Sequence, residues 1–123
     1  MELARYYQGD DIPVVIELFE DEAESVPVDI DNMLDLIVFV YTDGIRIAKY
    51  SKTVKTGYKT LTRNSSTNYS LIVETAFTKT FNPGILNMEI NEVTTAPGID
   101  DGRFNKIGVF PIAFLNKSLI KIE

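Results

Sequence analysis

Short runs in which apolar and polar residues alternate recur along most of this chain. In 85–93 apolar and polar residues alternate from Leu86 to Asn91, and 13–20 has one apolar face and one mixed face. Alternation with a period of two indicates a β-strand that buries one face. The run 34–41 is apolar on both faces, as expected for a central strand. The pattern predicts strands at 13–20, 34–41, 45–51, 55–61, 69–77, 85–93, 106–115 and 119–123.

Turn-forming sequences separate the predicted strands. Asp43 and Gly44 predict a tight hairpin turn between the two runs that flank them, because Asp-Gly tolerates a positive φ. The stretches 62–68 and 96–105 are polar or rich in turn formers and predict loops. Helical spacing is confined to at most one turn, at 20–25. Short strands with such regular turns predict an antiparallel sandwich or barrel.

Chain length and hydropathy bound the architecture further. A single sheet would leave the apolar faces of 34–41 and 85–93 in water, at about 1.5–3 kcal/mol for each large side chain, so two sheets are expected. The chain of 123 residues suffices for one domain, residues 1–123. No apolar run approaches the roughly 18 residues of a membrane span, and residues 1–11 lack the regions of a signal peptide. We therefore expect no membrane partner.

Charge is distributed unevenly along the chain. Residues 10–35 hold ten acids and no base, whereas 46–79 hold seven bases and one acid, in a chain of net charge −6. Two interpretations remain open. The two segments either form solvated surfaces that partly neutralise each other, or make a two-signed surface that docks subunits in a fixed orientation. The acidic balance and the lack of a basic stripe argue against nucleic acid as a partner.

The chain contains no cysteine and no histidine. This composition excludes disulfides, thiolate metal sites, the usual zinc ligands and the Ser–His and Cys–His nucleophile pairs. Carboxylate, lysine or tyrosine chemistry would remain, but Glu17 and Glu74 have no spacing that supports a glycosidase-like pair. We therefore predict no catalytic residue, no metal and no cofactor, and a protein that is not an enzyme.

Three kinds of short motif have simple structural interpretations. The acids of 29–35 lack the ligand pattern of a calcium loop and predict the solvated start of a strand. The Asp-Asp-Gly within 99–102 is typical of a turn. The N-x-S sequons at Asn64, Asn68 and Asn116 are predicted to be chance matches in polar loops.

The run 106–115 is apolar on both faces and is interrupted by Pro111. Because proline has no N–H, it favours an edge strand or a bend. Either the strand lies in the core, or its aromatic residues meet another chain, since exposed aromatic patches mark interfaces. We predict a protein interface at Phe110, Pro111 and Phe114. Alternation places Val109, Ala113 and Leu115 on one face and Phe110, Ile112 and Phe114 on the other.

Several of these elements recur together in one protein family. They are Tyr6 with the Gly-Asp-Asp-Ile-Pro of 9–13, the apolar strand and Asp-Gly turn of 36–44, the Thr-Phe-Asn-Pro-Gly of 80–84, and the strand of 86–90, with a later Asp-Asp-Gly-Arg. In this respect the chain resembles the N-terminal immunoglobulin-like domain of tailed-phage baseplate upper proteins and related virion accessory modules. In that family the domain usually forms the N-terminal part of a longer protein. The resemblance leaves open whether this chain belongs to the head or to the tail of the phage particle.

The resemblance implies a fold and a function. The implied fold is all-β, an immunoglobulin-like antiparallel β-sandwich of about 7–9 strands. The implied function is that of a non-enzymatic structural component of a tailed-phage virion, such as a capsid accessory or decoration protein, a fibre adaptor or a baseplate module. Its partners would be other virion proteins or further copies of itself, and its location the virion. The alternative is a carbohydrate-binding β-sandwich module with an aromatic platform drawn from Tyr41, Tyr50, Tyr58 and Tyr69.

Overall fold

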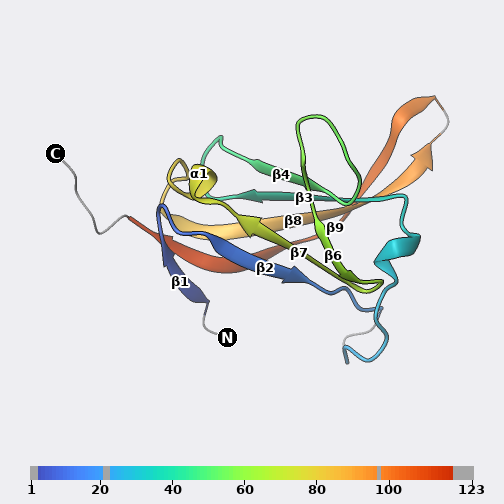
Figure 1. The fold of residues 1–123 in the computed structure, drawn as a ribbon, viewed down its shortest axis with the longest axis horizontal. Coiled ribbons are helices and arrows are strands. Elements are labelled where there is room, and N and C mark those ends of the chain that lie inside the picture. Colours follow the sequence, from blue (N-terminus) through green and yellow to red (C-terminus); the bar gives the residue numbers. More distant parts are fainter. Residues whose placement is uncertain (1–2, 21–22, 97, 118–123) are drawn as a thin grey trace.

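The computed structural model describes residues 3–20, 23–96 and 98–117, which form two β-sheets with a shared core (Figure 1). The larger sheet has six strands in the order β1-β9-β8-β3-β4-β5, and the smaller has three in the order β2-β7-β6. The predicted all-β sandwich is confirmed. The strands are β1 (Ala4–Tyr7), β2 (Ile12–Ile16), β3 (Asp35–Tyr41), β4 (Ala48–Ser51), β5 (Lys59–Thr60), β6 (Thr62–Ser65), β7 (Asn68–Val73), β8 (Gly84–Ala96) and β9 (Ile99–Asn116). The helices are the 3-10 helix η1 (Ile30–Asn32) and the single turn α1 (Thr75–Thr78).

The core lies between the sheets and is built from the faces that the alternation predicts to be apolar. Val14 and Ile16 of β2 are buried, whereas Val15 between them is exposed. Each large side chain buried in this way contributes about 1.5–3 kcal/mol to stability. The larger sheet supplies Leu36, Val38, Val40, Tyr50, Leu86, Met88, Ile90, Ala113 and Leu115, and the smaller supplies Ile12, Val14, Ile16, Tyr69, Leu71 and Val73.

The sandwich is not wholly antiparallel. β1 runs parallel to β9, with Ala4 opposite Ala113, and β4 runs parallel to β5. A parallel pair needs a connection longer than a hairpin. Between β1 and β9 almost the whole chain supplies that connection, and between β4 and β5 the loop at 52–58 supplies it. The expectation of antiparallel pairing throughout is therefore wrong at these two places.

β8 and β9 continue as a two-stranded arm beyond the rest of the larger sheet. β3 pairs with β8 only as far as Val93, whereas β8 and β9 remain paired up to Ala96 and Ile99. The predicted loop at 96–105 is therefore wrong, because this stretch holds a hairpin tip and the first part of β9. In Figure 1 the arm, coloured orange, projects from the sandwich at the upper right.

Three other segments differ from the sequence-based expectation. The predicted loop at 62–68 contains β6, whose four residues are all exposed, so that this strand depends on pairing with β7 rather than on a buried face. β7 ends at Val73, and α1 occupies part of the stretch predicted to continue as a strand to residue 77. β4 begins at Ala48, so Ile45 and Ile47 belong to the loop between β3 and β4 rather than to a strand.

One further strand is shorter than predicted, and two other predicted segments lie wholly or partly outside the described residues. The strand predicted at 55–61 is reduced to the two residues of β5. Residues 23–25 of the predicted helical turn at 20–25 are not helical, and 21–22 lie outside the described residues. The strand predicted at 119–123 also lies outside the described residues.

The acids of 29–35 have structural roles that the prediction of a solvated strand start missed. Asp29 caps η1, because its carboxylate accepts from the backbone N–H of Asp31 at 3.1 Å. Asp31 makes an ion pair with Arg63. Asp35 is buried, and both of its carboxylate oxygens accept from the hydroxyl of Ser51, at 2.9 and 2.8 Å. The prediction is therefore wrong for Asp35, whose buried carboxylate is hydrogen-bonded to β4 within the larger sheet.

Candidate docking surface

A β-bulge at Ile112 puts Phe110 and Phe114 on opposite faces of the larger sheet. The pairing of β9 with β8 shifts by one residue at this point. Phe110 pairs with Met88 and shares its inward face, whereas Phe114 pairs with the exposed Ile85 on the outer face. The expectation that both rings lie on one face is wrong, because an extra residue in one strand reverses the alternation.

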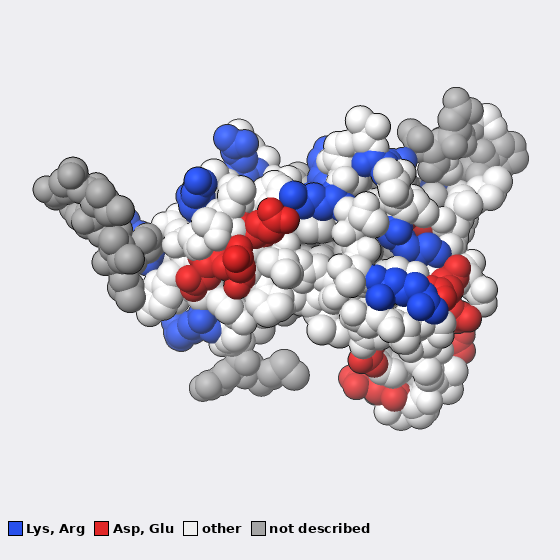
Figure 2. Space-filling view, in the orientation of Figure 1, with Lys and Arg blue, Asp and Glu red and all other residues white. Residues whose placement is uncertain are grey.

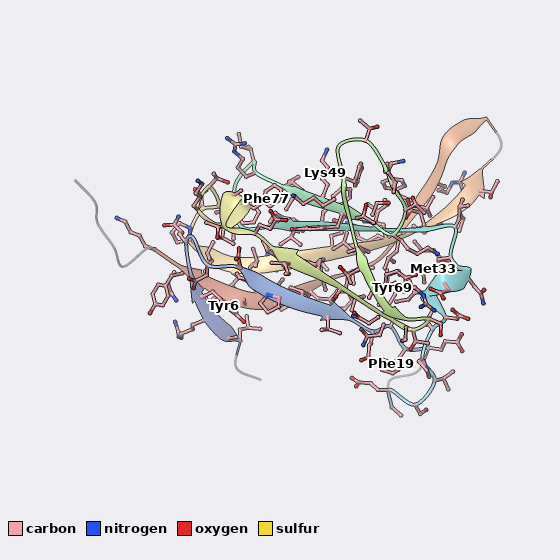
Figure 3. All side chains as sticks on the ribbon, viewed as in Figure 1. Tyr6, Phe19, Met33, Lys49, Tyr69 and Phe77 are labelled. Atoms are coloured by element: carbon pink, nitrogen blue, oxygen red, sulfur yellow. The ribbon has the colours of Figure 1, made fainter. Side chains whose placement is uncertain are left out.

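Phe110 lines an open groove of about 530 Å³ between the sheets. The groove lies where the smaller sheet ends and no longer covers β8 and β9. The segment that follows β2 and the end of η1 form its other wall, and Figure 3 shows Phe19 and Met33 at this end of the molecule. Phe110 is 40% exposed although its side chain lies on the inward face. The main apolar contributors are Leu18, Phe19, Met33, Met88, Ile90 and Phe110.

The charged residues that line this groove are all acidic among the residues that the structure describes. Glu17, Glu24 and Glu92 line it, and none of the described lining residues is a lysine or arginine. Figure 2 shows acidic side chains gathered at the lower right, over the segment that follows β2. The groove thus combines an apolar floor with negative charge, a combination that favours an occupant with apolar side chains and a positive group.

The other two predicted interface residues lie outside the groove. The guanidinium of Arg5 lies over the ring of Phe114, 5.2 Å from its centroid, and leaves that ring half-buried. Pro111 is exposed and lies next to the bulge, in the part of β9 that precedes its pairing with β1 at Ala113. The edge and the bend that a proline predicts are both present there. Of the predicted interface, the fold brings only Phe110 into a concave surface.

The four tyrosines of the carbohydrate-binding alternative do not form one platform. Tyr50 and Tyr69 are buried in the core. Tyr58 packs on the ring of Phe39, with Lys49 and Lys55 near its face. Tyr41 is half-exposed at the end of β3, in an open hollow that it lines with Ile85 and Asn87. An exposed stacking surface would therefore have to be built from Tyr41 and Tyr58 alone.

Glu17 and Glu74 lie apart. Glu17 follows β2 beside the start of β7, whereas Glu74 follows the end of β7, so the two residues flank opposite ends of this strand pair. The carboxylate of Glu17 accepts from the side-chain amide of Asn68 at 2.8 Å, and that of Glu74 pairs with Lys59 at 3.1 Å. Within the described ranges no three acidic side chains are grouped so that they could hold a metal ion. The side chains of Asp100 and Asp101 lie outside the described part of the structure.

The three sequon asparagines lie in strands rather than in the predicted loops. Asn64 belongs to β6 and donates through its amide to Asn68, the first residue of β7, at 2.8 Å. Asn116 ends β9 and donates to the backbone carbonyl of Tyr6 at 3.3 Å. Each side chain therefore has a structural use within the sheets.

The acidic and basic segments contact each other within one molecule, at its surface. Arg63 donates from Nε and Nη2 to the carboxylate of Asp31 at 2.8–3.0 Å, and the hydroxyl of Tyr69 donates to the same group. These hydrogen bonds, those of Arg63 first, lower the pKa of Asp31 to about 2. Part of the charge asymmetry is thus neutralised within one molecule. The acids that line the groove are not part of this network.

Comparison with protein-family models, with curated proteins and with solved structures finds no match for this chain. None of the helices in the described residues is long and apolar enough to cross a membrane.

Proposed function

We propose that this chain is a non-enzymatic docking module, and that it serves as a structural component of a tailed-phage virion. The observation that carries the docking role is the apolar groove around Phe110. The virion assignment rests on the sequence resemblance alone, which leaves open a capsid accessory or decoration protein, a fibre adaptor and a baseplate module.

The groove supports docking because it leaves core-like surface uncovered. Met88 and Ile90 belong to the same inward face as Phe110 and are buried, yet the phenyl ring beside them is open to solvent. An apolar recess rimmed by polar groups is typical of a surface that binds a partner. A partner side chain that filled it would gain about 25 cal/mol for each Å² of apolar surface removed from water.

The carbohydrate-binding alternative has weaker support. Two of its four aromatic candidates, Tyr50 and Tyr69, are used in the core. The groove itself offers a single phenylalanine and acidic residues rather than a row of exposed rings. We therefore keep the docking module as the proposal.

The proposal is tested by comparing Phe110→Ser with Phe114→Ser. Tailed-phage particles made from the genome that encodes this chain would be purified, and their proteins identified by mass spectrometry. Recombinant protein would then be added to particles produced without the chain, and its rebinding measured. We expect both variants to fold by circular dichroism, Phe110→Ser to lose rebinding and Phe114→Ser to retain it.

Two results would count against the proposal. If the protein is absent from purified particles, the virion assignment is wrong. If Phe110→Ser folds and rebinds as the wild type does, the groove is not the docking surface. If Phe110→Ser is unfolded, Glu92→Lys is used instead, because it changes the charge of the groove without removing apolar volume. Loss of rebinding by Glu92→Lys would then support the groove as the docking surface, and rebinding at the wild-type level would reject it.

A further inference from the structure

The loop between β3 and β4 presents an apolar tip with a positive charge. Ile45 is 95% exposed and Ile47 is 47% exposed, and the exposed Arg46 lies between them. β-branched apolar residues favour strands, and here two of them stand in a loop open to water. A tip of this composition is complementary to the groove, because the groove has an apolar floor and the charged residues that line it are acidic.

The base of this loop is held in place by a neighbouring turn. The side-chain amide of Asn82 donates to the carbonyl of Asp43 at 2.6 Å. Gly44 has a φ of 144°, and a Cβ there would lie 2.8 Å from the amide nitrogen of Asn82. Thr42, the first residue of the loop, is buried. A fixed base lowers the entropy lost when the tip binds.

One copy cannot fill its own groove with this tip. Met33, which lines the groove, precedes the first residue of β3, whereas the loop follows the last. The seven residues of β3 separate them by about 20 Å, at about 3.3 Å per residue. Figure 1 shows the loop at the upper left, and Figure 3 shows Met33 at the right. The tip is therefore available only to another molecule.

We infer that the Ile45–Arg46–Ile47 tip of one copy binds in the acidic apolar groove of a second copy, so that copies associate head to tail. This inference rests on the proposed function and names the partner of the same groove. Ile45 or Ile47 would pack against Phe110, and Arg46 would pair with a carboxylate of the rim. The two surfaces differ, so the interface is heterologous, and each copy is both donor and acceptor in a ring or a filament.

A mixing experiment separates this arrangement from other modes of self-association. The loop variant is Ile45→Ser with Arg46→Glu, and the groove variant is Phe110→Ser. Analytical ultracentrifugation of the full chain measures the species formed. Each variant alone is expected to be monomeric, because it lacks one of the two surfaces. Mixed in equal amounts they should form a dimer and nothing larger, because the loop variant retains the groove and the groove variant retains the loop.

Two controls sharpen the result. Val54 is another apolar loop residue, 92% exposed and outside the proposed interface, so Val54→Ser should leave wild-type association unchanged. Glu92→Lys replaces Phe110→Ser if the latter fails to fold. It should weaken association by about tenfold or more, because a like charge would then face Arg46. Wild-type association should also weaken between about 0.05 and 0.5 M salt, because the Debye length falls to a few Å.

Several outcomes would overturn the inference. They are a wild-type chain that stays monomeric, a loop variant that associates as the wild type does, and a mixture of two monomeric variants that yields no dimer. None of these outcomes bears on the proposed function, which depends on the presence of the protein in purified particles and on the rebinding of Phe110→Ser to particles. A chain that is monomeric yet loses particle binding through Phe110→Ser would keep the proposed function and reject the second copy as partner.

Discussion

The phenol of Tyr50 donates a hydrogen bond to the backbone carbonyl of Ile72, with 3.1 Å between the two oxygens. Tyr50 belongs to β4 in the larger sheet and Ile72 to β7 in the smaller, so this bond ties the two sheets together. Ile72 lies beyond Ser70, the last residue at which β7 pairs with β6. Burial raises the pKa of Tyr50 above its ordinary value, which keeps the phenol protonated and able to donate.

Tyr50→Phe should therefore destabilise the sandwich without creating a cavity. The substitution removes the hydroxyl and leaves the ring in the core, so we expect the free energy of unfolding to fall by about 0.5–1.5 kcal/mol. Urea denaturation followed by circular dichroism measures the change. Tyr41→Phe is the matched control, because Tyr41 is half-exposed outside the core, and it should stay within about 0.5 kcal/mol of the wild type. Equal effects of the two substitutions would contradict a structural role for the bond.

The ion pair between Asp31 and Arg63 predicts a pH dependence. Hydrogen bonds from Arg63 and Tyr69 lower the pKa of Asp31 from 3.8 to about 2 in the folded protein. Because the folded value lies below the unfolded one, the network stabilises the fold above about pH 4, and this contribution is lost as the pH falls towards 2.

Carbon NMR of the Asp31 carboxyl group across a pH titration tests this directly. We expect a midpoint near 2 in the wild type and a return towards 3.8 in Arg63→Gln. Arg46→Gln removes a base from the β3–β4 loop instead and should leave the midpoint unchanged. A wild-type midpoint near 3.8 would show that the pair does not form in solution.

The alternation was a sufficient guide where one face of a strand packs and the other is solvated. Leu86, Met88 and Ile90 are buried as their spacing predicts. The same rule fails in β9, where both faces are apolar and the pattern gives no sign that Ile112 is an extra residue. It also fails for β6, because a strand whose residues are all exposed carries no hydrophobic period. The bulge in β9 and the strand β6 both depend on pairing with a neighbouring strand rather than on the local sequence.

The groove could be predicted only in part. The aromatic signal of the C-terminal run identified Phe110, which lines it. The opposite wall comes from Phe19, Met33 and the segment after β2, which precede that run by some eighty residues. Whether these residues come to lie opposite Phe110 depends on the length of the smaller sheet relative to the larger one. The exposed tip at Ile45 was not predicted either, because the spacing of Ile45 and Ile47 is typical of a strand.

Lys52 fastens η1 to the end of β4. Its ammonium donates to the backbone carbonyls of Ile30 at 3.0 Å and Asp31 at 3.1 Å, and also to that of Met33. Lys52→Met keeps the aliphatic stem and removes all three donors, so we expect a loss of about 1–3 kcal/mol in the free energy of unfolding. Because Met33 lines the groove, the variant should also weaken docking.

Hydrogen exchange measured by mass spectrometry would locate the effect of Lys52→Met. Exchange should become faster in the peptide that contains residues 30–33, and change little in β2 and β7. Lys49→Met is the control, because the ammonium of Lys49 lies over the ring of Tyr58 and away from η1. Unchanged protection of 30–33 would mean that the three contacts do not stabilise this segment.

Gly102 lies in the projecting arm, where the neighbouring strand approaches its backbone closely. Its φ is +77°, and a Cβ there would lie 2.7 Å from the carbonyl oxygen of Thr94 and 2.8 Å from a methyl carbon of Val93. Gly98 has a similar φ of +79° but no atom within 4 Å of the added carbon. Substitution by alanine strains the backbone at both positions, at about 1–2 kcal/mol, and causes a steric conflict at Gly102 alone.

Gly102→Ala and Gly98→Ala therefore form a matched pair. We expect hydrogen exchange in the arm to accelerate more in Gly102→Ala than in Gly98→Ala, because a backbone oxygen cannot move aside as a flexible side chain can. The sandwich core should keep its protection in both, since the arm extends beyond the last residue of β8 that pairs with β3. If the two variants exchange alike, the close approach to Thr94 does not constrain the arm. If Gly98→Ala exchanges faster, the hairpin tip rather than the close approach at Gly102 sets the stability of the arm.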